Sequence, residues 1–183
     1  MTATALTLNP RPRTLIHPGR LNPVRIQSRH APRGRHFRLA LQPGLTLFAA
    51  LVGPLSEADV RSASTTILGG WFDDIQYCVA PPDPSGRAVV AYSEPIGAGR
   101  AYLVFGNATL GKTLERRPLV HCHGTLRTER GCVKGGHILT ERSVIGPEPI
   151  TVLVTALDGF ELLQAYDPET NMPLLQPQEE IRR

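Results

Sequence analysis

From Phe37 onward, apolar residues alternate with polar residues in short segments separated by turn-forming residues. Alternation over about four to eight residues is typical of a half-buried strand, because successive side chains of a strand point to opposite faces. Glycine and proline between the segments favour turns. We predict strands at residues 37–41, 65–68, 72–80, 87–93, 102–110, 119–126, 132–139 and 150–155, with turns at residues 81–86 and 97–99.

One segment has helical spacing. Leu45, Phe48, Ala49 and Val52 recur at intervals of three or four residues, which predicts a short helix that ends before Pro54. Ser56 and the residues after it could start a further short turn. The fold class that we expect is therefore α+β, a mainly antiparallel β-sheet with one or two short helices.

The composition is that of a folded protein with a core. The chain has 183 residues, 41% of them hydrophobic and 20% charged, which fits one domain and excludes wholesale disorder. Its longest apolar run, residues 45–52, is far shorter than the roughly 20 residues of a membrane helix. Three cysteines without a signal peptide predict a cytoplasmic protein with reduced thiols, and we expect Cys78, Cys122 and Cys132 to be buried.

Positive charge is concentrated at the N-terminus. Residues 1–36 contain no acid, which leaves 13 of the 20 basic residues and all 16 acidic residues for the rest of the chain. Five prolines in the same stretch prevent a long helix and favour extended backbone. We divide the chain into an N-terminal arm (1–36), a domain (37–176) and a loose C-terminal tail (177–183). The arginines of the arm are Arg11, Arg13, Arg20, Arg25, Arg29, Arg33 and Arg35.

Three histidines fall within 17 residues of one another, at His121, His123 and His137. Residues two apart on a strand share a face, so His121 and His123 point together and Cys122 points the opposite way. A turn at residues 128–131 predicts a hairpin. If the hairpin is symmetric about Arg130, His123 lies directly opposite His137 and the three rings meet. A slip of one residue would send His137 to the other face.

Three neutral imidazoles on a sheet suit Zn²⁺ or another late first-row divalent ion, with one coordination position left open. Neither Glu129 nor Glu141 has the spacing of a catalytic acid or base. The alternative is that the histidines form hydrogen bonds in a core or at a subunit seam. Divergent rings would exclude the metal site.

These motifs resemble the PPC domain (plants and prokaryotes conserved), in its bacterial histidine-containing branch. The resemblance runs from about Phe37 to Leu175 and includes the His-Cys-His-Gly segment at residues 121–124 and the Gly-Gly-His segment at residues 135–137. It implies an α+β fold assembled as a homotrimer. It also implies a metal at the matching histidines and an association with DNA.

In plants the PPC domain follows an AT-hook, and the arm of this chain contains a partial match at residues 32–35, Pro-Arg-Gly-Arg, followed by His36 instead of proline. Arginines on extended backbone can enter the narrow minor groove of A·T-rich double-stranded DNA. The competing interpretation is an ordered arm that packs on its own domain or on a neighbouring subunit. Its apolar contacts would then be Leu15, Ile16, Leu21, Val24 and Ile26.

The sequence leaves three hypotheses for function. The first is a trimeric DNA-binding module that holds a divalent metal, zinc before others, at the three histidines and contacts DNA through the seven arginines of the arm. The second is a metal-dependent enzyme or small-ligand-binding protein with a pocket beside the metal. The third is an assembly scaffold with a structural metal or an empty histidine cluster.

Overall fold

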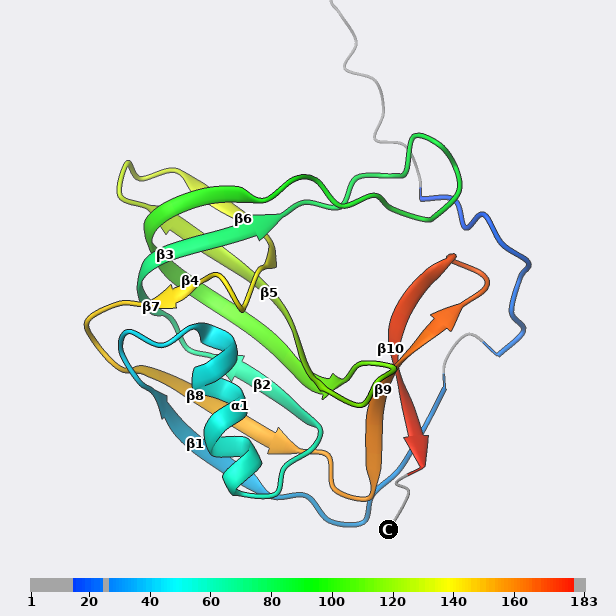
Figure 1. The fold of residues 1–183 in the computed structure, drawn as a ribbon, viewed down its shortest axis with the longest axis horizontal. Helices are drawn as coiled ribbons and strands as arrows, with labels where there is room; N and C mark the ends of the chain where they lie inside the picture. Colours follow the sequence, from blue (N-terminus) through cyan, green and yellow to red (C-terminus); the bar gives the residue numbers. More distant parts are fainter. Residues whose placement is uncertain (1–14, 25–26, 180–183) are drawn as a thin grey trace, which may run out of the picture.

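The computed structural model describes residues 15–24 and 27–179. Within these residues the chain forms one helix and ten strands, and the strands join in a single, mainly antiparallel sheet (Figure 1). The predicted α+β class is confirmed. The elements are β1 (His36–Leu41), α1 (Leu47–Glu57), β2 (Ala63–Ile67), β3 (Gly70–Cys78), β4 (Ile96–Lys112), β5 (Pro118–Thr128), β6 (Val133–Ile138), β7 (Val144–Ile145), β8 (Ile150–Ala156), β9 (Phe160–Asp167) and β10 (Met172–Glu179).

The main path of the sheet is β1-β8-β2-β4-β5-β6-β3-β7. The long strands β4 and β5 lie at its middle, and β3 pairs with both β4 and β6. The hairpin β9–β10 branches away from this path and touches it through a parallel bridge between Lys112 and Leu163. In Figure 1 the hairpin stands to one side of the sheet, beside the N-terminal arm.

Helix α1 begins because the side chain of Thr46 accepts a hydrogen bond from the backbone N–H of Ala49. The predicted end before Pro54 is wrong, since the helix continues through this proline to Glu57. Leu55, one residue after the proline, is 1% exposed. We attribute the extra turn to the burial of Leu55, which favours a helical turn that the proline ring disfavours.

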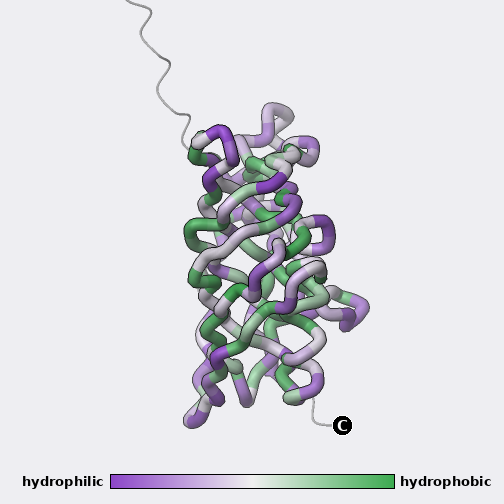
Figure 2. Tube along the Cα trace, turned by 90° about the vertical axis from the view of Figure 1, so that its left-hand side faces the viewer, coloured by the Kyte–Doolittle hydropathy of each residue, from purple (hydrophilic) through white to green (hydrophobic). Residues whose placement is uncertain are grey.

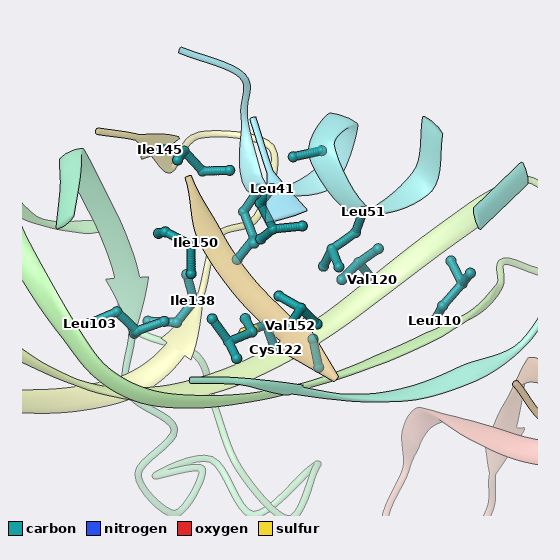
Figure 3. Packing of buried hydrophobic residues seen from close by; sticks show 14 of the residues in the cluster. Leu41, Leu51, Leu103, Leu110, Val120, Cys122, Ile138, Ile145, Ile150 and Val152 are labelled. Atoms are coloured by element: carbon teal, nitrogen blue, oxygen red, sulfur yellow. The ribbon is translucent and has the colours of Figure 1, made fainter. Parts of the chain in front are cut away.

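The core lies between α1 and the inner face of the sheet. Figure 3 shows Leu51 of the helix near Val120 of β5, with Cys122 close to Val152. Cys78 and Cys122 are buried, as expected, but Cys132 is exposed because it lies in the turn after β5. Seen from the side in Figure 2, the molecule is narrow, and hydrophilic segments gather at the outer turns.

The opposite, outer face of the sheet is only partly covered. Antiparallel pairing brings Leu153, Thr66, Asn107 and His123 into one row across four strands. Because directly paired residues share a face, this row identifies the histidine-bearing face as the outer one. The row ends next to His137 on β6.

The predicted strand at residues 87–93 is wrong. This segment belongs to a loop, in which Pro82 and Val90 form an isolated bridge. The carboxylate of Asp83 accepts hydrogen bonds from the backbone N–H groups of Ser85, Arg87 and Ala88. These bonds satisfy the backbone locally, which stabilises the loop in place of a sheet ladder.

The predicted turn at residues 97–99 is also wrong, because these residues belong to β4. Gly99 has a φ of 62°, and the register of the β3–β4 ladder shifts beside it. A glycine at this point marks a β-bulge, which permits the strand to continue through glycine-rich sequence.

Neither β9 nor β10 was predicted, and the expected tail from residue 177 is wrong at its start, since β10 runs to Glu179. Pro173 and Pro177 interrupt the alternating pattern of β10. Proline has no N–H to donate. The two prolines are tolerated because, among the described residues, β10 pairs with β9 alone, so the positions without an N–H can face its unpaired edge.

Candidate metal centre

The hairpin β5–β6 has the predicted register. His123 pairs with His137, and the ladder continues from Cys122↔Ile138 to Arg127↔Val133. Gly131, with a φ of 80°, adopts the left-handed conformation that closes the turn, and its N–H donates to the carbonyl of Thr128. The alternation of the sequence and this turn therefore place all three histidines on one face.

Glycine allows β6 to lie close to β3. A Cβ on Gly136 would lie 2.3 Å from the backbone oxygen of Cys78, far inside normal contact distance. With only hydrogen at this position, β6 pairs with β3 through Tyr77↔Ile138 and Cys78↔His137. His137 is thus held by two neighbouring strands, which restrains the position of its ring.

The three imidazoles form a compact triad. Ring centroids are 4.8 Å apart for His121 and His123, 4.7 Å for His121 and His137, and 5.5 Å for His123 and His137. One nitrogen from each ring lies within 4.8 Å of the other two. Two nitrogens bound to one Zn²⁺ at about 2.1 Å lie at most about 4.2 Å apart, so small ring rotations would bring the widest pair within reach.

An unpartnered polar atom also fits a metal. Nδ1 of His137 is buried and has no hydrogen-bond partner among the residues that the structure describes. A buried polar nitrogen without a partner costs free energy, and bonding to an ion would remove that cost. The donor set of three imidazoles suits zinc, so the residues present fit the group.

Electrostatics keeps the rings ready to bind a cation. Burial lowers the pKa of His137 to about 4, with a further contribution from the nearby His121 and His123. Burial also lowers the pKa of His121, followed by repulsion from His123. His121 and His137 are therefore neutral at pH 7, which leaves a lone pair on each for a metal.

Cys122 behaves as predicted from strand alternation. Its side chain points into the core on the opposite face, and burial raises the pKa of its thiol to about 12. A buried protonated thiol on the far face is not a ligand candidate.

Two neighbours of the triad were missed by the sequence reasoning. Cys78 lies directly opposite His137 across the β3–β6 pair, and the ring centroid of Tyr92 is 5.4 Å from that of His137. Burial raises the pKa of Tyr92, with a smaller contribution from Cys78. Both residues come from distant parts of the sequence, so no local pattern could have placed them here.

The N-terminal arm packs in part on the domain. The backbone N–H of Gly19 donates to the carbonyl of Glu169, and the Glu169 carboxylate accepts from the N–H of Asn22. His17 Nδ1 lies 2.7 Å from the same carboxylate. The arm is therefore ordered against the β9–β10 turn at these residues.

The apolar residues expected to pack the arm onto the domain are largely exposed where the structure describes them. Four of the five residues are exposed, and Ile26 lies outside the described residues. Packing of the arm is polar instead, through the groups around Glu169. The exposed residues are Leu15, Ile16, Leu21 and Val24.

The arginines of the arm differ in their surroundings. Arg35 forms an ion pair with Asp158 at 2.8 Å and donates to the carbonyls of Ala58 and Asp59. Its guanidinium is thus engaged by its own domain. Arg20, Arg29 and Arg33 are exposed, while Arg11, Arg13 and Arg25 lie outside the described residues.

Among the described residues no helix has the length and apolar character to cross a membrane. No family model matches the sequence. No curated protein matches it either.

Several solved structures share the fold. A PPC protein from Pyrococcus horikoshii has a TM-score of 0.59 and 17% identity, over 81% of this chain and 94% of its own. The chain has a PPC-like fold. A metal-containing protein from Archaeoglobus fulgidus has a TM-score of 0.63 and 18% identity, covering 83% and 99% of the two chains. A proposed DNA-binding protein from Ralstonia eutropha JMP134 has a TM-score of 0.62 and 19% identity, covering 76% and 89%.

Proposed function

We propose that this protein binds one divalent metal ion, with zinc as the preferred ion, through His121, His123 and His137. The observation that carries the proposal is the meeting of three imidazole nitrogens within 4.8 Å of one another on one sheet face. The buried, unpartnered Nδ1 of His137 supports it independently. A PPC-fold relative that contains metal is consistent with the same assignment.

When bound, a zinc ion supplies Lewis acidity at its open coordination position. The chain's own residues hold and orient that position. Strand β5 fixes His121 and His123, and the close contact of β6 with β3 fixes His137. Among the described residues, no Asp or Glu clusters with the three histidines. Hydrolysis would need such an acid or base, so the geometry supports metal binding better than a hydrolytic reaction.

A zinc titration of the metal-free protein, with a competing chelating dye, tests the site. We expect one ion per chain for the wild type and at least a hundredfold weaker binding for His123→Ala, whose side chain is exposed and whose loss should leave the fold intact. His36→Ala, an exposed histidine of β1, is the matched control and should bind as the wild type does. Equal affinities for His123→Ala and His36→Ala would contradict the proposal.

We further propose that the arm contacts double-stranded DNA. The support is the proposed DNA-binding activity of PPC-fold relatives and the exposed arginines at positions 20, 29 and 33. Arg35 contributes less, because Asp158 already neutralises it. The other six arginines of the arm, Arg11, Arg13, Arg20, Arg25, Arg29 and Arg33, are the proposed phosphate and minor-groove contacts.

Mobility shifts of a duplex over a salt series test this contact. If the six arginines each neutralise one phosphate, replacing all six by glutamine should flatten the slope of log K against log salt by about 5. The matched control replaces Arg127 and Arg130 of the domain by glutamine. An unchanged slope in the six-residue variant would exclude the arm as the contact.

The proposed assembly is a cytoplasmic homotrimer. In one chain the outer sheet face exposes Val104, Phe105 and Leu153, which are 48%, 51% and 45% exposed. Apolar side chains on an uncovered sheet face favour contact with another chain. Light scattering coupled to gel filtration should give three times the 20.0 kDa chain mass, whereas a monomer mass would contradict this assembly.

A further inference from the structure

A cavity lies beside the metal triad. Its volume is about 720 Å³, within the range of small-molecule sites. One wall is the outer face of the sheet, with Thr109, Leu119 and His121, and the other wall is the β9–β10 hairpin, with Leu162 and residues 172–175. The hairpin thus forms one side of an open cavity next to two of the three histidines.

Two histidines connect the cavity with the triad. His121 and His137 both line it, together with Cys78 and Tyr92. Three protein ligands leave a coordination position open on a zinc ion. Since two of the three ligands belong to the cavity wall, a molecule in the cavity can reach that position.

The remaining lining is apolar and uncharged. Aliphatic side chains from both walls dominate. The polar groups besides the histidines are the thiol of Cys78 and the side chains of Tyr92, Thr109 and Gln164. No lysine, arginine, aspartate or glutamate occurs among the described residues that line the cavity. The aliphatic side chains are Leu119, Val120, Leu139, Leu162, Met172, Leu174 and Leu175.

An apolar, uncharged lining next to a proposed metal position selects a class of ligand. Three neutral imidazoles leave the full charge of a divalent ion uncompensated, which favours an anionic oxygen donor at the open position. A doubly charged phosphate head would need several hydrogen-bond donors or cations, which this lining does not offer. A singly charged carboxylate needs fewer, and its aliphatic body would be buried against the leucines.

We propose that the cavity binds a monocarboxylate with an aliphatic body, such as a medium-chain fatty acid. Its carboxylate occupies the open position of the metal, and its chain extends between the sheet and the β9–β10 hairpin. This inference rests on the proposed metal site. It adds a ligand class and a second structural element, the hairpin, to that site.

Cobalt substitution reports metal binding and carboxylate binding separately. Co²⁺ at three histidines gives visible absorption that changes when the open position takes a new ligand. The full-length protein loaded with Co²⁺ is titrated with octanoate, acetate and 1-octanol. Octanoate has the head and the body, acetate has the head alone, and octanol has the body without a charge.

We expect the dissociation constant of octanoate, measured from the change in the cobalt spectrum, to be at least a hundredfold lower than that of acetate. Each buried methylene contributes about fourfold in affinity. Octanol should leave the spectrum unchanged. Equal affinities of octanoate and acetate, or no spectral response to octanoate, would overturn the inference while leaving the metal site intact. Absence of a cobalt spectrum would instead overturn the metal site itself.

A variant locates the body of the ligand. Leu174 lines the cavity and is 40% exposed, so Leu174→Glu should fold and should weaken octanoate at least tenfold by placing a negative charge beside its chain. Leu114→Glu, at an exposed leucine in the β4–β5 turn, is the matched control and should bind octanoate normally. Equal octanoate affinity in the two variants would show that the hairpin cavity is not the site.

Discussion

Replacing Gly136 by alanine tests how β3 positions the histidine triad. The added Cβ would lie 2.3 Å from the backbone oxygen of Cys78, whereas ordinary contacts begin at 3.4 Å. The two strands must therefore separate by about 1 Å, which breaks or lengthens about two backbone hydrogen bonds. Each is worth about 1 kcal/mol, and overpacking adds about 1 to 3 kcal/mol. We expect the free energy of unfolding to fall by about 3 to 5 kcal/mol.

The same displacement moves His137, the next residue. A ligand shifted by about 1 Å no longer fits coordination at about 2.1 Å, so zinc affinity should fall at least tenfold. Urea unfolding of the metal-free protein measures the first effect, and chelator competition measures the second.

Gly97→Ala is the matched control for this glycine. It lies in β4 and an added Cβ would meet nothing within 4 Å. We expect its stability and its zinc affinity to equal those of the wild type. If Gly136→Ala unfolds and binds zinc as Gly97→Ala does, the close contact between β6 and β3 does not position His137.

Three further predictions concern other parts of the molecule. Burial works against ionisation of Glu161, but the hydrogen bond and charge of Lys112, with Arg116, hold its pKa below the ordinary value of 4.5. The ionised carboxylate therefore stabilises the fold above pH 4.5, and this contribution is lost as the pH falls further. Urea unfolding should show that Glu161→Gln lowers the free energy of unfolding by about 2 kcal/mol at pH 7 and makes stability depend less on pH below 4.5. The same pH dependence in wild type and variant would contradict this. Thr46→Ala removes the cap of α1 and should cost about 1 kcal/mol in the same assay, and no loss would refute the capping role. His17→Ala should loosen the arm and speed tryptic cleavage after Arg20, whereas His30→Ala should not; equal cleavage rates would show that the His17–Glu169 contact does not anchor the arm.

Local sequence patterns predicted the hairpin that carries the three histidines. The register of β5 with β6 depends on a short turn and on strict alternation, and both can be read from neighbouring residues. The His123↔His137 pair is therefore correct, as is the opposite orientation of Cys122. The strand register and the side-chain orientation in this hairpin are determined by about twenty consecutive residues.

Features that depend on distant contacts were not predicted. The helix continues beyond Pro54 because Leu55 is buried in the core. The local sequence around the proline does not indicate this burial. Residues 87–93 have strand-like composition, yet they form a loop. Asp83 accepts from the backbone N–H groups of Arg87 and Ala88, and Val89 donates to the distant carbonyl of Thr170. Tyr92 lies beside His137 because this loop returns alongside the residues that follow β3, where the N–H of Ser93 donates to the carbonyl of Val79.

The hairpin β9–β10 shows the same limit at the other side of the site. Its prolines hide the alternating pattern, and its place beside the triad is set by contacts with the end of β4. The cavity therefore emerges only when the whole sheet is assembled, since its two walls are separated by about forty residues of sequence.

Zinc anomalous scattering from crystals of the zinc-loaded protein tests the central claim most directly. We predict one peak per chain at about 2.1 Å from one nitrogen each of His121, His123 and His137. Absence of that peak, or a peak bound by other residues while the three rings stay unliganded, would contradict the account.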